Sequence, residues 1–149
     1  GDGRMLSWLE QEIEKRGLKK SITLAGPHPI AKMPDFFRQA DTLLVSLKDE
    51  PIFSMTIPGK LQAYLMAGKP ILAMLNGEGA NIVNEAGCGV TCCAGDGKGL
   101  ATAVQKLRKM AKADLVEMGQ NGIKVSKREF NREKLIGQLE SWMLELHEN

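Results

Sequence analysis

The sequence predicts an α/β fold with a mostly parallel, doubly wound β-sheet and helices on both faces. Short apolar runs alternate along the chain with segments of helical periodicity, and no hairpin signal separates the runs. The 149 residues, 43% hydrophobic and 26% charged, have the size and composition of one globular domain. Sheets of this kind bind ligands at the carboxyl ends of their strands, so a functional site is expected in the loops that follow the strands.

The N-terminal part of the chain carries two expected helices and two expected strands. Met5, Trp8, Leu9 and Ile13 recur at three- and four-residue spacing and mark an amphipathic helix that Gly17 ends. The expected elements are a helix over 4–16, a short strand over 21–26, a helix from about 33 to 39 and a buried strand over 42–47. Irregular loops are expected over 27–29 and 48–56.

The rest of the chain continues the alternation. The expected elements are a strand over 71–75, a helix near 81–85, a strand over 90–93, a helix near 100–111 and further helix to residue 149, interrupted near 119–126. The final helix, about residues 131–147, carries the apolar stripe Leu135, Leu139, Trp142, Met143 and Leu146.

A helix beginning near Pro58 carries the clearest functional signal. Pro58 suits the first helical position, and Gly59 leaves the backbone open to a ligand on the unpaired N–H groups of the first turn. Lys60 adds a positive charge at the helix end where the dipole disfavours one, which a bound anion would explain. Gly68 ends this helix. The stretch therefore predicts a phosphate site, although an ordinary solvated helix start fits the same residues.

Composition argues against several classes of partner and location. A net charge of +2 with one Tyr and four Phe gives neither a basic stripe nor much stacking surface, so no nucleic-acid partner is expected. The apolar runs are too short to span a bilayer and no secretory signal is visible, which predicts a cytoplasmic protein. Because the chain begins with Gly1 rather than Met, we expect native sequence upstream.

The three cysteines are expected to be reduced packing residues. Cys88, Cys92 and Cys93 lie in one apolar run, far in sequence from both histidines. Neighbouring residues of a strand point to opposite faces, which disfavours a shared zinc site or a disulfide framework. Asp49 and Glu50 are adjacent rather than spaced for shared coordination, so no metal site is expected.

The order of motifs resembles the C-terminal, nucleotide-sugar-binding half of retaining glycosyltransferases with the GT-B fold, which consists of two Rossmann-like domains. The resemblance spans nearly the whole chain and rests on Gly1-Asp2-Gly3, Leu24-Ala25-Gly26, Ala40-Asp41, Glu50, Ala67 to Leu72, Ala86 to Gly89 and Ala94-Gly95-Asp96. The sequence Pro58-Gly59-Lys60 resembles a branch that builds bacterial surface polysaccharides. The resemblance implies that residues 1–149 are a single, partial Rossmann-like domain whose first strands are missing, which would leave a split sheet or an exposed edge.

The resemblance also implies a donor site. The implied nucleotide-diphosphate contacts are Pro58, Gly59 and Lys60 for the diphosphate and Gly26, Pro27 and Ile30 for the nucleobase, with Glu50 against the donor sugar. The donor would be a nucleotide-diphosphate sugar, with a UDP-sugar favoured, and the reaction would be hexosyl transfer with retention and without cofactor or metal. The acceptor, a saccharide or a lipid-linked molecule, would bind an N-terminal domain, so this chain alone is expected to be inactive.

Two positions depart from the family pattern. Many relatives grip the ribose with a glutamate on the helix, and counting back from Gly68 puts Ala63 at that place. Gln62 is the neighbouring candidate, but it would point about 100° away on a helix. His28, between two prolines, is expected to be a loop residue rather than a catalytic base.

Other functions and contacts stay open. A nonenzymatic binding or scaffold module of the same fold fits the missing glutamate, whereas a dinucleotide-dependent dehydrogenase would need a third glycine that Gly1-Asp2-Gly3-Arg4-Met5-Leu6 lacks. The parent protein could rest on the inner face of a membrane through the basic helix face of Lys106, Arg108, Lys109 and Lys112, or that face could be merely solvated. The nucleobase, sugar, acceptor and oligomeric state, including a homo-oligomer, are not fixed by the sequence.

Overall fold

The computed structural model describes residues 3–147, so Gly1 and Asp2 of the expected Gly-Asp-Gly turn lie outside the described residues. Packing divides the chain into two compact units, one up to Phe36 and the other from Phe37 onward. Each unit is described here by itself. The prediction of a single partial domain over 1–149 stays a prediction.

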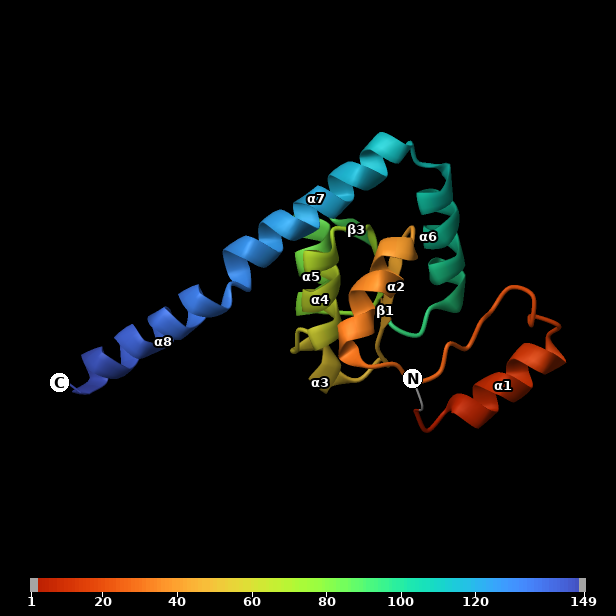
Figure 1. Ribbon diagram of the computed structural model, residues 1–149, viewed down its shortest axis with the longest axis horizontal. Coiled ribbons are helices and arrows are strands. Elements are labelled where there is room, and N and C mark those ends of the chain that lie inside the picture. Colours follow the sequence, from red (N-terminus) through yellow and green to blue (C-terminus); the bar gives the residue numbers. More distant parts are fainter. Residues whose placement is uncertain (1–2, 148–149) are drawn as a thin grey trace. The chain divides into compact units, whose positions relative to one another are not determined.

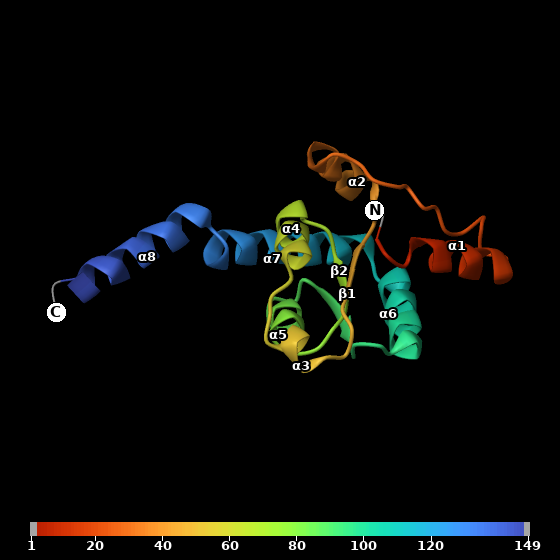
Figure 2. The ribbon, with the colours of Figure 1, turned by 90° about the horizontal axis from the view of Figure 1, so that it is seen from below.

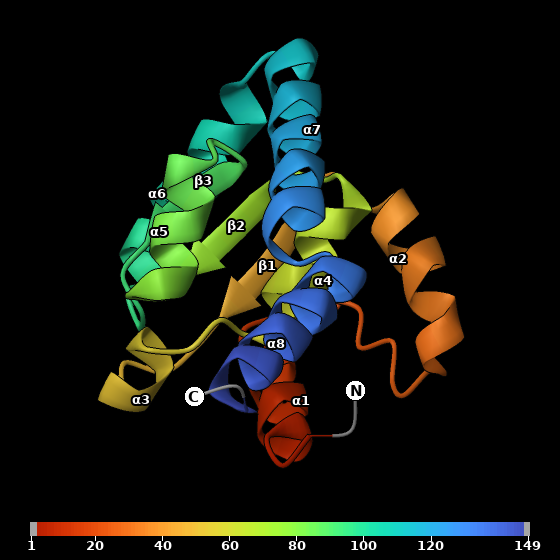
Figure 3. The same ribbon diagram turned by 90° about the vertical axis from the view of Figure 1, so that its left-hand side faces the viewer.

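The second unit is built on a three-stranded parallel sheet. Strands β1 (Leu43–Ser46), β2 (Ile71–Met74) and β3 (Gly89–Cys92) lie side by side in chain order, as Figure 3 shows. In the register Val45 faces Ala73, and Ala73 faces Thr91. The three strands confirm the expectations for 42–47, 71–75 and 90–93, because continuous branched runs suit strands covered on both sides.

Helices cover both faces of this sheet, which confirms the predicted α/β architecture. Helices α4 (Gly59–Ala67) and α5 (Glu78–Glu85) lie on one face and α6 (Gly97–Lys109) on the other (Figure 2). Helix α7 (Lys112–Glu129) contributes to both sides, with Val125 in the larger core cluster and Leu115 and Met118 against the smaller one. The larger core cluster joins Val45, Leu61, Leu65, Ile71, Ala73, Leu75, Val83, Cys88 and Val125. The smaller cluster packs Leu72 against Ala103 and Leu107 of α6. Alternate residues of β2 therefore supply opposite cores.

Helix α7 corrects the expected interruption near 119–126, because it runs unbroken through that segment. Gly119 and Gly122 are buried where α7 crosses α4. A Cβ on Gly119 would clash with the Gly68 carbonyl, and one on Gly122 would lie 3.2 Å from the Leu65 carbonyl oxygen. These glycines allow two helices to approach closely and do not break the helix.

The expected strand over 21–26 is not formed, which corrects that prediction. In the first unit, α1 (Leu6–Lys15) is followed by a segment with no regular structure as far as Pro29, then a short 3₁₀ helix, η1 (Ile30–Lys32). A strand needs a neighbour to pair its N–H and C=O groups, and the described residues of this unit provide none. Helix α2 (Met33–Gln39) then bridges to the second unit, as expected.

The remaining differences concern helix boundaries. The loop over 48–56 contains a short helix, α3 (Pro51–Ser54), and α5 begins three residues before the expected start. Helix α8 (Arg132–His147) confirms the predicted final helix, but none of its residues is buried. Figure 1 traces this element order along the chain. In the described sheet, β1 and β3 each pair on one side only, so both are edge strands, and the expectation that missing upstream strands leave the β1 edge exposed stays a prediction.

Candidate functional site

The start of α4 lies just beyond the carboxyl end of β1, with α3 between them. Pro58 is the N-cap residue rather than the first helical residue: its ψ of 138° is extended, and its carbonyl accepts the Leu61 N–H at 2.8 Å. Gly59 and Lys60 are therefore the first two residues of α4, and both are exposed. No side chain caps this helix start, and a Cβ on Gly59 would meet no atom within 4 Å. The side chains therefore leave the N–H groups of Gly59 and Lys60 uncapped, as an anion site requires.

Ala63, the position that departs from the family pattern, and its neighbour Gln62 lie on the second turn of α4. Gln62 and Ala63 are both exposed, and their neighbours Leu61 and Leu65 are fully buried. The helix therefore presents the 62 and 63 positions to solvent. The Ala63 side chain has no polar group to offer to a ribose, so of these two side chains only Gln62 can make a polar contact.

Glu50 is the N-cap residue of α3. Its backbone is extended, with a φ of −133°, and its side chain does not cap the helix and is exposed. The Ser54 hydroxyl donates to the Pro51 carbonyl at 2.8 Å, which closes this single helical turn. Glu50 is thus left to face solvent at the beginning of a short, locally bonded segment that leads to Pro58.

The sequence did not reveal the side chain that joins the loops at this edge of the sheet. Asn76, directly after β2 and Leu75, donates from Nδ2 to Oδ1 of Asp49 at 2.8 Å. Its Oδ1 accepts the N–H of Ala94 at 3.1 Å. Asp49 follows β1 and Ala94 follows β3, so one carboxamide links the loops after all three strands. An Asn-Gly pair is a common turn signal, and it conceals such a role.

The residues expected against the nucleobase lie in the first unit. Gly26 adopts a φ of +72°, and Ile30 begins η1 with 88% of its surface exposed. Between them, Nε2 of His28 lies 2.8 Å from the carbonyl oxygen of Ala25, and its ring packs against Phe36 at 4.9 Å between ring centres. Pro27 and Ile30 are exposed in this loop. That Gly26, Pro27 and Ile30 share a crevice with Lys60 stays a prediction.

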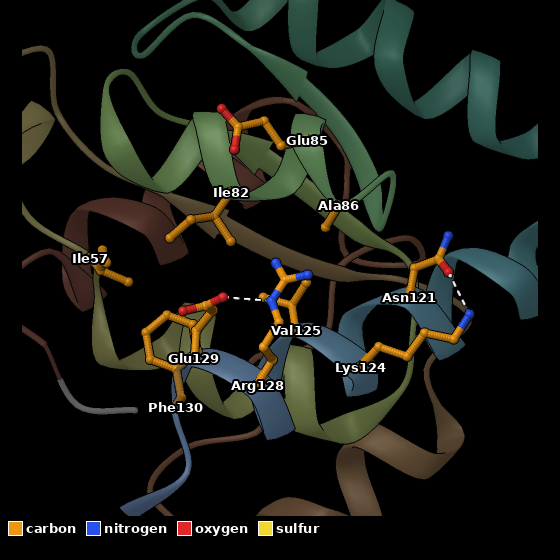
Figure 4. Close-up of a pocket in the computed structure, with 10 residues that line it drawn as sticks. All are labelled: Ile57, Ile82, Glu85, Ala86, Asn121, Lys124, Val125, Arg128, Glu129 and Phe130. Carbon is orange, nitrogen blue, oxygen red and sulfur yellow. Dashed lines mark hydrogen bonds and ion pairs between the residues drawn. The ribbon is translucent and has the colours of Figure 1, made fainter. Parts of the chain in front are cut away.

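A separate cavity of about 570 Å³ lies between α5 and the last turns of α7 (Figure 4). Its lining residues are Ile57, Ile82, Glu85, Ala86, Asn121, Lys124, Val125, Arg128, Glu129 and Phe130. Of the charged groups that line it, Arg128 Nε pairs with Glu129 at 2.5 Å, while Lys124 keeps its charge and donates a hydrogen bond to the Asn121 carboxamide at 3.3 Å. Ile57, next to Pro58, is the one lining residue that adjoins the expected site.

The cysteines differ in their surroundings. Cys88 is fully buried, and burial raises the pKa of its thiol to about 11, while its Sγ lies 3.7 Å from the carbonyl oxygen of Val83. Burial, followed by the nearby Asp96 and Cys93, raises the pKa of Cys92. Cys93 is exposed. Residues 3–147 contain no group of three His, Cys, Asp or Glu side chains arranged to hold a metal ion.

The three parallel strands and the helices on both faces define an α/β domain, a class of fold in which ligands bind at the carboxyl edge of the sheet. The family model of the glycosyl transferases group 1 matches residues 1–110, and the chain belongs to this family. The match covers both units up to the end of α6 and leaves α7 and α8 outside it. No individual curated protein matches the chain. No helix within residues 3–147 is long and apolar enough to cross a membrane.

Proposed function

We propose that this chain is the donor-binding part of a retaining glycosyltransferase. It would bind a nucleotide-diphosphate sugar, with a UDP-sugar favoured, and the sugar would pass to a saccharide or lipid-linked acceptor during synthesis of bacterial surface polysaccharide. The observation that supports this most directly is the uncapped, open start of α4 at the carboxyl edge of a parallel sheet in a chain of the group 1 family.

The chemistry of that helix start suits a leaving diphosphate. The unpaired N–H groups of Gly59 and Lys60 carry the positive end of the helix dipole, and the Lys60 ammonium adds a full charge. When the bond from the sugar to the diphosphate breaks, negative charge accumulates on the departing oxygen. Fixed donors at that position stabilise the charge more in the transition state than in the ground state, which accelerates the transfer.

The remaining contacts are proposed from the same family. Glu50 would accept hydrogen bonds from the donor sugar, and the loop with Gly26, Pro27 and Ile30 would face the nucleobase. No cofactor or metal would be needed, because the helix start and Lys60 supply the positive charge. The acceptor would be held by a separate N-terminal domain, so the chain alone would bind donor without turnover.

A scaffold module that has lost its site is the alternative, and Ala63 favours it because a ribose-binding carboxylate is missing from α4. Contact of the parent protein with an anionic membrane through Lys106, Arg108 and Lys109 of α6 and Lys112 of α7 is a further proposal, as is a homo-oligomer of this chain. Donor binding separates the enzyme from the scaffold, since a scaffold that has lost its site would not respond to nucleotides.

The test is a titration of the chain with UDP, GDP, ADP and NAD, followed by thermal unfolding and calorimetry. We expect one nucleoside diphosphate to raise the unfolding temperature, and Lys60→Ala to weaken its binding about tenfold, as for loss of one charge-assisted contact. Gly59→Val should weaken binding further, because its side chain fills the open space before the helix.

Helix α6 provides matched controls. Gly97 and Lys98 are its first two residues, both exposed, but the side chain of Asp96 caps that helix by accepting the Gly99 N–H at 2.9 Å. Gly97→Val and Lys98→Ala should therefore leave nucleotide binding unchanged. The proposal would be contradicted if the α6 variants lost as much binding as the α4 variants, or if the native chain responded to no nucleoside diphosphate.

A further inference from the structure

The turn that joins β2 to α5, together with the first turn of α5, contacts the segment from Asp49 to the start of α4 at several points. Asn76 reaches the loops after β1 and β3 through its two hydrogen bonds. Gly77 has a φ of +71°, and a Cβ there would clash with the Ser54 carbonyl, so its backbone lies directly against α3. A Cβ on Gly79 would lie 3.5 Å from both the Pro58 ring and the Leu61 side chain. The turn therefore touches the chain before, within and after α3.

The orientation of the Asn76 carboxamide is determined by its partners. An ionised Asp49 carboxylate can only accept a hydrogen bond, and the backbone N–H of Ala94 can only donate one. The amide nitrogen must therefore face Asp49 and the amide oxygen must face Ala94, at 2.8 Å and 3.1 Å. An aspartate at position 76 could keep the second bond, but it would place two carboxylates against each other at the first.

We propose that Asn76 is a positioning residue for the donor site: its hydrogen bond to Asp49 fixes the segment from Asp49 to Gly59. This inference rests on the proposed function, because that segment carries Glu50 at its beginning and leads into the open start of α4. Asn76 touches no donor atom in this scheme. It acts through Asp49, which adjoins Glu50, while Gly77 and Gly79 hold α3 and Pro58 from the same turn.

The hydrogen bonds inside the segment 49–58 are local, which explains why the segment needs a hydrogen bond from another part of the chain to hold it in place. Apart from the backbone bonds of α3 itself, the hydrogen bonds within 49–58 join residues two or three apart, such as Ser54 hydroxyl to Pro51 carbonyl and Phe53 N–H to Glu50 carbonyl at 3.0 Å. Such bonds close a single turn and do not anchor it to the sheet. Among the side-chain bonds of the described residues, the bond from Asn76 joins this segment to a loop that is 27 residues away in the chain. Its loss should release Glu50 and the approach to α4 together.

The experiment exchanges the side chains of the two hydrogen-bond partners, Asn76 and Asp49. Asn76→Asp should weaken binding of UDP, or of whichever nucleoside diphosphate the native chain binds, about tenfold, and should speed amide hydrogen exchange over 49–59. Asp49→Asn should change little, because Asn76 can still donate to an amide oxygen. The double variant, Asp49→Asn with Asn76→Asp, reverses donor and acceptor and should restore both the affinity and the slow exchange.

The matched control is Asn84→Asp, which makes the same chemical change on α5. Asn84 accepts the Thr91 hydroxyl at 2.9 Å, and an aspartate can still accept it, so exchange over 49–59 and nucleotide affinity should not change. Unchanged exchange over 49–59 in Asn76→Asp, or no rescue in the double variant, overturns the inference. Faster exchange with undiminished affinity overturns it too. If amide exchange responds as expected but the native chain binds no nucleotide, the proposed function is wrong, while the Asn76–Asp49 hydrogen bond is still shown to fix the segment 49–59.

Discussion

At the scale of single residues, two glycines determine how closely α7 can approach α4. Gly119 lies against the Gly68 carbonyl, so Gly119→Ala must push two backbones apart and should destabilise the fold by about 2–3 kcal/mol. Gly137→Ala in α8 is the matched control, because a Cβ there meets no atom within 4 Å and helix propensity should favour it by about 0.5–1 kcal/mol. Urea unfolding measures both. A neutral Gly119→Ala would contradict the close packing of the two helices.

The buried thiol of Cys88 gives a pH-dependent prediction. Its pKa is raised by burial from the 9.0 of a free thiol to about 11, so the folded protein holds this proton more tightly than the unfolded chain. Its contribution to stability is therefore complete below about pH 9 and is lost as the pH rises toward about 11. Iodoacetamide at pH 8 should modify exposed Cys93 and spare Cys88, as judged by fragmenting the tryptic peptide 61–98, which carries both thiols, in a tandem mass spectrometer. Equal labelling of both thiols in the folded chain would show that Cys88 is not buried.

At the scale of elements, α4 and α8 differ in what they contribute to stability. Leu61 of α4 is fully buried in the larger core, so Leu61→Ala should cost about 2–5 kcal/mol from lost burial and a residual cavity. Leu139 of α8 is 54% exposed, so Leu139→Ala should change the free energy of unfolding by less than about 0.5 kcal/mol. Thermal and urea unfolding compare the two variants. A large effect at Leu139 would mean that the apolar stripe of α8 is covered in solution.

The elements that could be predicted from sequence are those with a local signature. Continuous apolar runs predicted the strands around Val45 and Ala73. Gly68 predicted the end of α4, and in the structure it is the C-cap residue with a φ of +66°. Gly119 was misread because glycine also permits close packing, and that use depends on a helix about fifty residues away in the chain. Similarly, the 21–26 segment has strand-forming residues, but a strand also needs a neighbour that local sequence does not specify.

The candidate site also combines features that local sequence predicts with contacts that it does not. The open start of α4 follows from local sequence, since Pro58 and Gly59 dictate a helix without a polar cap. Asn76 could not have been found, because its two partners follow different strands and meet only when the parallel sheet forms. Contacts that depend on several strands are a property of the assembled sheet, so the tertiary fold rather than the motif decides which loops act together.

At the scale of the whole molecule, the two compact units should differ in their resistance to proteolysis. Residues 22–29 form no regular structure and are almost all exposed, and Lys19 and Lys20 immediately before them are exposed as well. Limited trypsin treatment should therefore cut first after Lys19 or Lys20, or after Lys134 in the unburied α8, and leave the sheet with α4 to α7 intact. The fragments are identified by intact mass.

The lysines within the second unit provide the internal comparison for that experiment. Lys60 and Lys106 are exposed as side chains but belong to helices whose inner faces lie in the two cores, so their peptide bonds are not free to enter a protease. Replacing both Lys19 and Lys20 with Ala should slow the first N-terminal cut without altering cleavage in α8. Early cutting at Lys60 or Lys106 would show that the sheet unit opens as readily as the N-terminal segment. The division of the chain into a loosely bonded N-terminal unit and a stable sheet unit would then be wrong, because the covered sheet would no longer be the more stable part.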